Sequence, residues 1–244
     1  MKSFFSKKSI LRTMAVAAVC MLGTSNAQAQ EFTIQGDLVS SYVWRGIYQG
    51  GAASFQPTLG FSVGNFSLTA WGSTSLSESN KEIDLTAAYK FGEAGPTLSV
   101  ATLWWDGQAD VANGELTNNY FHFKSGDTGH HFEAGLAYTL PIEKFPLSIA
   151  WYTMFAGADR KTTDEGEEKQ AYSSYVELNY PFSVKGVDLN ATCGVVPYKT
   201  PQYNVNGFAV TNLALKATKA INFNDKFSLP IFVQAIWNPR LEDA

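Results

Sequence analysis

Few side chains in this sequence could carry out catalysis, and no established catalytic pattern joins them. Three histidines, His122, His130 and His131, lie close together, with Ser125 between the first two. A Ser–His–acid hydrolase needs a serine activated by a neighbouring histidine, but Ser125 does not lie in the Gly-x-Ser-x-Gly pattern of a nucleophile elbow. His130 and His131 begin a strand-like segment, so their side chains point to opposite faces. We therefore expect that the protein is not an enzyme and has no catalytic residue. The histidines are expected to lie at the rim, on a solvated loop.

Metal binding finds equally little support in the spacing of the ligand-type residues. His122, Asp127 and His131 match no established zinc pattern. The acidic run Asp164–Glu168 lacks the regular spacing of a calcium loop, and such runs are usually solvated surface. We expect no metal site and no cofactor.

The segments around these residues alternate between apolar and polar side chains, which is the periodicity of β-strands. Between Ile83 and Phe91, the odd positions are apolar and end in aromatics, whereas the even positions include Asp84 and Lys90. Eleven such segments are predicted, at 32–45, 54–63, 66–75, 82–91, 97–105, 130–140, 146–155, 171–180, 187–196, 208–219 and 228–238.

The connections between the segments alternate in length, and aromatic residues gather at segment ends. Short turns such as 64–65 alternate with longer loops such as 106–129. Both features are typical of an outer-membrane β-barrel with an aromatic girdle. A soluble β-sandwich also alternates, but its strands average about five or six residues. The sequence therefore predicts an all-β, transmembrane, antiparallel up-and-down β-barrel.

A barrel of this kind has one face toward lipid and one toward its lumen. Polar and charged residues of the inward set are the candidates to line the lumen: Asp37, Arg45, Asp84, Lys90, Glu133, Glu177, Asp188 and Lys216. Aromatic residues near segment ends are the candidates for the membrane interface: Trp44, Tyr89, Trp104, Tyr138, Tyr180 and Trp237.

The first 29 residues predict a cleavable secretory signal peptide. Four cations precede the short apolar run 14–22, and Ala27-Gln-Ala29 forms a cleavage site. Without residues 1–29, 14 Lys and Arg remain of 18, against 22 Asp and Glu, a net charge of −8. Such a charge argues against nucleic acid as a partner, because its phosphates require a basic face. Residues 30–244 then form one domain, with Cys193 as its only cysteine.

The sequence resembles the TorF-type porin family in several short motifs. They are Tyr42-Val-Trp-Arg-Gly46, Gln49-Gly50, Gln56-Pro57, Trp71-Gly72-Ser73, the run 145–157, and the ending Phe227-Ser-Leu-Pro-Ile-Phe with Asn238-Pro239. The resemblance covers most of residues 30–244. It implies an outer-membrane barrel that acts as a porin.

Three functions are compatible with such a barrel. The first is a channel for passive diffusion of small polar solutes, with outer-membrane lipid around it. The second is a closed barrel serving in adhesion or envelope structure, and a distant third is a lipid-modifying enzyme. Roughly twelve strands lie between a filled interior and an open channel. Neither the solute nor the oligomeric state follows from the residues.

Two local features each have two interpretations. Arg45 could act as a fixed charge that biases permeating anions, or it could pair with an acid while Trp44 anchors at the interface and Gly46 releases the strand. Loop 106–129 could fold inward and constrict a pore, or extend its flanking strands.

An even strand number is the rule for bacterial single-chain barrels. Since eleven segments are present, a twelfth strand ending in an aromatic residue is expected to follow in the intact protein. On this interpretation the sequence is truncated at its C-terminus, and the last strand of the barrel is missing. Open edges at the first and eleventh strands would otherwise face lipid, at several kcal/mol per unsatisfied group.

Overall fold

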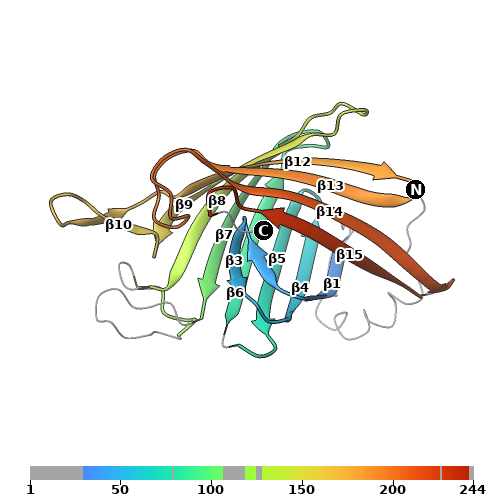
Figure 1. Ribbon diagram of the computed structural model, residues 1–244, viewed down its shortest axis with the longest axis horizontal. Helices are drawn as coiled ribbons and strands as arrows, with labels where there is room; N and C mark the ends of the chain where they lie inside the picture. Colours follow the sequence, from blue (N-terminus) through green and yellow to red (C-terminus); the bar gives the residue numbers. More distant parts are fainter. Residues whose placement is uncertain (1–29, 79, 107–118, 125–127, 226, 242–244) are drawn as a thin grey trace, which may run out of the picture.

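The computed structural model describes residues 30–78, 80–106, 119–124, 128–225 and 227–241. The proposed signal peptide, residues 1–29, lies outside this part of the protein. An antiparallel sheet of eleven strands dominates the fold, in the order β1-β4-β5-β6-β7-β8-β9-β12-β13-β14-β15 (Figure 1). Each strand therefore pairs with the next sheet strand in the sequence, as in a meander.

The sheet strands are β1 (Gln30–Val39), β4 (Ser54–Val63), β5 (Phe66–Ser75), β6 (Lys81–Lys90), β7 (Thr97–Trp105), β8 (His130–Thr139), β9 (Ser148–Gly157), β12 (Ser174–Val184), β13 (Val187–Val196), β14 (Ala209–Asn224) and β15 (Phe227–Trp237). Two short hairpins are separate from the sheet: β2 (Tyr42–Trp44) with β3 (Ile47–Gly50), and β10 (Arg160–Thr162) with β11 (Glu168–Gln170).

The prediction of eleven alternating strands is confirmed, and four of them have the predicted bounds. The predicted first strand, 32–45, is wrong at its end, because β1 stops at Val39 and the backbone then folds back into the β2–β3 hairpin. Ser40 and Ser41 form the bend between β1 and β2. The tenth predicted segment, 208–219, is also longer than expected, since β14 continues to Asn224.

Tight turns set the register of the hairpins. Val184 pairs with Val187, and the two residues between them, Lys185 and Gly186, have φ values of 50° and 76°. Positive φ at both positions defines a type I′ turn, whose twist matches that of the flanking strands. The register that this turn sets continues along the pair to Val176 and Val195.

The sheet is strongly curved (Figure 1), and its two faces differ in chemistry. We call the face that contacts the β2–β3 hairpin the inner face and the opposite one the outer face. Leu85 and Leu136, on the outer face, remain 44% and 48% exposed. Many other large apolar residues of the outer face are similarly exposed: Phe32, Ile34, Leu38, Phe55, Leu59, Leu68, Ile83, Leu98, Val100, Ile149, Trp151, Phe155, Leu178, Phe182, Leu215, Leu229, Ile231 and Val233.

This apolar surface extends from β1 to β15, far beyond the few hundred Å² that soluble monomers expose as one patch. No helix within the described ranges is long and apolar enough to cross a membrane.

The two ends of the sheet are β1 and β15. Among the described residues, pairing extends from β1 to β4 and from β15 to β14, and no pairing joins β1 to β15. The expected twelfth strand stays a prediction.

Candidate functional site

The β2–β3 hairpin places an arginine against the inner face of the sheet. Trp44 pairs with Ile47, and the residues between them, Arg45 and Gly46, have φ values of 50° and 81°. The left-handed region costs a residue with a Cβ about 1–2 kcal/mol. Contacts of the Arg45 side chain must offset this strain.

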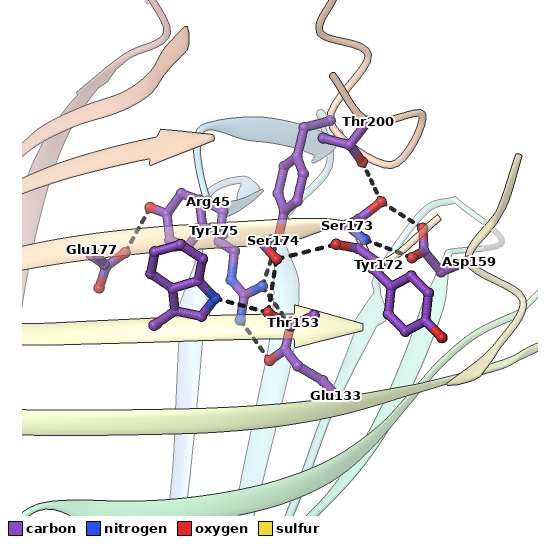
Figure 2. A network of polar contacts seen from close by, with 12 residues as sticks. Arg45, Glu133, Thr153, Asp159, Tyr172, Ser173, Ser174, Tyr175, Glu177 and Thr200 are labelled. Carbon is purple, nitrogen blue, oxygen red and sulfur yellow. Dashed lines mark hydrogen bonds and ion pairs between the residues drawn. The ribbon is translucent and has the colours of Figure 1, made fainter. Parts of the chain in front are cut away.

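Glu133 of β8 receives both ends of the Arg45 guanidinium (Figure 2). The Nη1–Oε2 distance is 2.6 Å and the Nη2–Oε1 distance is 2.7 Å. Arg45 Nη1 also donates to the Tyr203 hydroxyl at 2.7 Å. The side chains of Arg45 and Glu133 are only 12% and 6% exposed. A bidentate pair of this kind combines charge with two directed hydrogen bonds.

Three aromatic rings surround the guanidinium. Its central carbon lies 4.7 Å from the ring centroid of Trp44, 4.4 Å from that of Tyr152 and 4.9 Å from that of Tyr175. A cation–π contact contributes about 0.5–1 kcal/mol at an exposed site and about 2 kcal/mol or more when it is desolvated. Trp44 in turn stacks on Tyr203, with ring centroids 5.5 Å apart and planes 6° apart. We call Arg45, Glu133, Tyr203 and the three rings the Arg45 cage.

The charge of Arg45 is compensated within this cage. Burial disfavours the charged guanidinium, but Tyr203 and Glu133 outweigh that effect and hold the pKa of Arg45 well above its ordinary value. Burial also disfavours the charged form of Tyr203, and it therefore raises the pKa of that phenol. Of the two interpretations of Arg45, the structure shows the ion pair. Arg45 is therefore not a free fixed charge.

Gly46 anchors the hairpin on the far side of the cage. Its carbonyl oxygen accepts a hydrogen bond from Asn238 Nδ2 at 3.0 Å. A Cβ at this position would lie 1.8 Å from the carbonyl oxygen of Thr211 in β14. Gly46 is required both for its positive φ and for this close approach.

A second polar network joins the connections that follow β9 and β13 (Figure 2). Asp159 accepts hydrogen bonds from the backbone nitrogen of Ser173 at 2.8 Å and from its hydroxyl at 2.6 Å. The Ser173 hydroxyl also contacts the Thr200 hydroxyl. Burial raises the pKa of the Asp159 carboxyl, and the hydrogen bonds from Ser173 and Gln170 oppose that rise. This network holds the segment that carries Tyr203 in place.

The strand register places the other seven lumen candidates on the inner face. Side chains alternate between the two faces along each strand, and residues that pair across strands lie on the same face. The pairing therefore places Asp37 in β1, Glu177 in β12 and Lys216 in β14 on one face. Asp84, Lys90, Glu133 and Asp188 belong to the same set.

Several of these residues have partners on the inner face. Glu177 accepts hydrogen bonds from the Tyr175 hydroxyl at 2.8 Å and from Asn179 at 2.7 Å. Lys216 Nζ lies 4.0 Å from the ring centroid of Phe232. Asp37 and Asp188 accept hydrogen bonds from Gln35 and Ser183. The inner face thus carries a series of local polar pairs rather than one cluster.

Five of the six interface candidates lie on the outer face, and Trp44 does not. Tyr89 and Trp237 are 45% and 49% exposed, whereas Trp104 is 6% exposed because Tyr120 and His130 cover it. Tyr138 and Tyr180, both half-buried, lie on the outer face near the ends of their strands. Trp44 packs inward against Trp105, with ring centroids 5.4 Å apart.

The expectation of rim histidines on a solvated loop is wrong for His130 and His131, which begin β8 and are 0% and 2% exposed. Neither belongs to the Arg45 cage. His130 lies on the outer face, where its Nδ1 is 2.7 Å from the Thr102 hydroxyl and Phe123 stacks on its ring. His131 lies on the inner face against Trp105. Most of loop 106–129 falls outside the described residues; its described stretch 119–124 packs against Trp104 and His130. Within the described ranges, no three His, Cys, Asp or Glu gather into a metal site.

Sequence reasoning missed two residues that matter to the inner face. Tyr203 lies in an irregular connection, where no periodicity indicates which side chain turns inward. Glu82 is 2% exposed and shares its face with Asp84; its parity in the strand could have identified it. The hairpin itself had a signal in Arg45-Gly46 between two alternating runs, because a glycine at such a position favours a tight turn.

The fold and site define an all-β protein with an eleven-stranded antiparallel sheet and a hairpin held against its inner face. A scan of protein-family models, a search of curated proteins and a search of solved structures each found no match to this protein.

Replacing Gly46 by alanine should destabilise the fold more than replacing Gly186 by alanine. Both glycines follow a cationic residue in a two-residue turn with positive φ, so the backbone strain is similar. An added Cβ at Gly186 meets no atom within 4 Å, unlike one at Gly46. We expect G46A to lose about 1–3 kcal/mol more than G186A, measured by equilibrium urea unfolding. Equal losses would show that the hairpin is not packed as described.

Removing one partner of the Arg45–Glu133 pair should be costly. R45M or E133Q alone leaves a buried group without its partner and should destabilise the protein by about 3–5 kcal/mol. The double variant should lose less than the sum of the two single losses. K169M is the matched control, because Lys169 and Glu167 pair at 2.8 Å while 54% and 63% exposed, and it should change stability by less than about 0.5 kcal/mol. Additive losses for R45M and E133Q would contradict a direct interaction.

Proposed function

We propose that this protein is an outer-membrane β-barrel that acts as a narrow channel for passive diffusion of small polar solutes. The observation that carries the proposal is the opposite chemistry of the two sheet faces. The outer face exposes large apolar residues on every strand except β13, whose outward residues are half-buried, and the inner face carries acids, amides and lysines.

Lipid solvates an apolar outer face and offers no hydrogen-bond partners to the backbone, so only a closed sheet crosses it. A strongly curved antiparallel meander is the arrangement that closes most directly into a barrel. Tyr89, Tyr138, Tyr180 and Trp237 near strand ends fit the interface, where amphipathic rings are favoured. The resemblance to the TorF-type porin family supports the same function.

The β2–β3 hairpin makes the proposed channel narrow. It extends across the inner face from the β1 side to β8, through Arg45 and Glu133, and to β14, through Gly46 and Thr211. Solutes would pass beside it, along the polar pairs of the inner face. The second candidate, a closed structural barrel, is favoured by the same hairpin if its packing blocks the lumen completely.

Loosening the hairpin should enlarge the current through the channel. Arg45 and Asn238 both fasten it, so the variant R45M/N238A should show at least about a twofold larger single-channel conductance than the unmodified protein in a planar bilayer. K169M should leave the conductance unchanged. Absence of current in both the unmodified protein and R45M/N238A would favour the closed barrel.

The channel should also prefer cations, because acids outnumber lysines on the inner face. The reversal potential measured across a salt gradient tests this preference.

The two faces should also differ in their access to water once the protein is in vesicles. Leu85 lies on the outer face and Thr86, the next residue of β6, on the inner face. In a C193S background, a water-soluble maleimide should label T86C and leave L85C largely unlabelled, because lipid covers the outer face. Denaturation in urea should make both fully reactive, which controls for thiol integrity. Faster labelling of L85C than of T86C in vesicles would overturn the membrane orientation.

A further inference from the structure

A cavity lies between the β2–β3 hairpin and the adjoining ends of β4 to β7. Its volume is about 200 Å³. Tyr42 and Gln49 line it from the hairpin, and Ser73, Glu82, Trp105 and Asp106 line it from the sheet side. Glu82 pairs with Ser73 on one side and with Trp105 on the other. The cavity does not include the Arg45 cage.

Glu82 is the feature of this cavity that needs an explanation. The residue is 2% exposed, yet neither of its carboxylate oxygens has a hydrogen-bond partner among the described residues. Tyr42, Asp84 and Trp105 are the polar side chains next to this carboxyl, but none of them meets it with the distance and angle of a regular hydrogen bond. Folded proteins rarely leave a buried carboxylate unpaired, because its desolvation costs several kcal/mol.

Two further atoms around the cavity share this property. Trp105 Nε1, a donor, and Asp106 Oδ1, an acceptor, also lack hydrogen-bond partners among the described residues. Asp106 is already compensated in charge, since its Oδ2 lies 3.5 Å from Lys81 Nζ. The lining therefore has one acid without an ion-pair partner among the described residues, Glu82, together with a further acceptor at Asp106 and one donor at Trp105.

A monocation with several N–H or O–H donors and one acceptor would balance the carboxylate form of Glu82 and satisfy the unpartnered atoms of Trp105 and Asp106. An ammonium group supplies the charge and three donors, and a neighbouring hydroxyl supplies an acceptor for the indole N–H and a further donor for Asp106. A quaternary ammonium has no N–H to offer the carboxylate. A neutral diol has no charge to balance Glu82.

We propose that this cavity binds a small primary-ammonium compound with a hydroxyl next to the amine, with Glu82 as the group that receives the ammonium. The site goes beyond the proposed channel function, because binding requires no conduction. The hairpin forms one wall of the cavity and is tied to the β5–β6 connection there, because the Asn80 side-chain amide donates to the backbone carbonyl of Gln49 at 2.7 Å.

Isothermal titration calorimetry on the purified full-length protein in detergent micelles tests the proposal with ethanolamine as the probe. Ethylene glycol is the neutral analogue, choline is the cationic analogue without N–H donors, and potassium chloride tests for an inorganic cation. We expect ethanolamine to bind at least about tenfold more tightly than the other three. This comparison uses the unmodified protein, so it does not depend on the folding of any variant.

The variant E82Q keeps the shape of the side chain and removes its charge, so it should weaken ethanolamine binding at least about tenfold. E143Q removes the same charge from an exposed turn residue and should change the affinity less than about twofold. No heat of binding with ethanolamine, equal affinity for choline or potassium, or unchanged affinity in a folded E82Q would each overturn the proposal. None of these results depends on whether the protein conducts ions.

Discussion

A guanidinium taken out of water needs a counter-charge and hydrogen bonds at its new position, and Arg45 finds both far away in the sequence. Glu133 lies 88 residues further on, and Tyr203 lies 158 residues further on. Because the pair is buried, it is stable only if the hairpin turn, β8 and the connection after β13 hold their places together. Three other features keep the Arg45 guanidinium between Glu133 and Tyr203. They are the left-handed backbone of Arg45, the close packing of Gly46 on Thr211 and the Asp159–Ser173–Thr200 network. The large sheet supplies the frame, and the Arg45 cage fixes what lies inside its curve.

The sheet is predictable because each of its strands separates polar from apolar residues. Residues such as Ile83, Leu85 and Tyr89 report one face, while Asp84 and Lys90 report the other. That alternation depends only on residues close together in the sequence, so the strands and their two faces can be predicted from a single sequence. Turn residues such as Lys185-Gly186 then set the register locally.

The site is less predictable, because its contacts join residues that no local pattern connects. The alternation of β1 continues through Tyr42 and Trp44, and nothing in that pattern reveals the reversal of direction at Ser40 and Ser41. The pattern therefore assigns Trp44 to the membrane interface, although this residue packs inward against Trp105 and Tyr203. Pairing of Arg45 with an acid follows from the cost of burying a charge, but the choice of Glu133 among several inner acids requires the three-dimensional structure.

The long separations across the Arg45 cage also constrain the order in which the molecule can assemble. Gly46 binds Asn238, 192 residues away, and it packs on Thr211 in β14. Strand pairs of the meander form between sequence neighbours and need little loop closure, whereas the hairpin has nothing to dock on until β8, β14 and the residues after β15 are in position. The β2–β3 hairpin, although it precedes nearly all of the sheet in the sequence, is therefore expected to dock last. The docking of Trp44 and Arg45 then joins the β2–β3 hairpin to β8, to β14 and to the residues after β15.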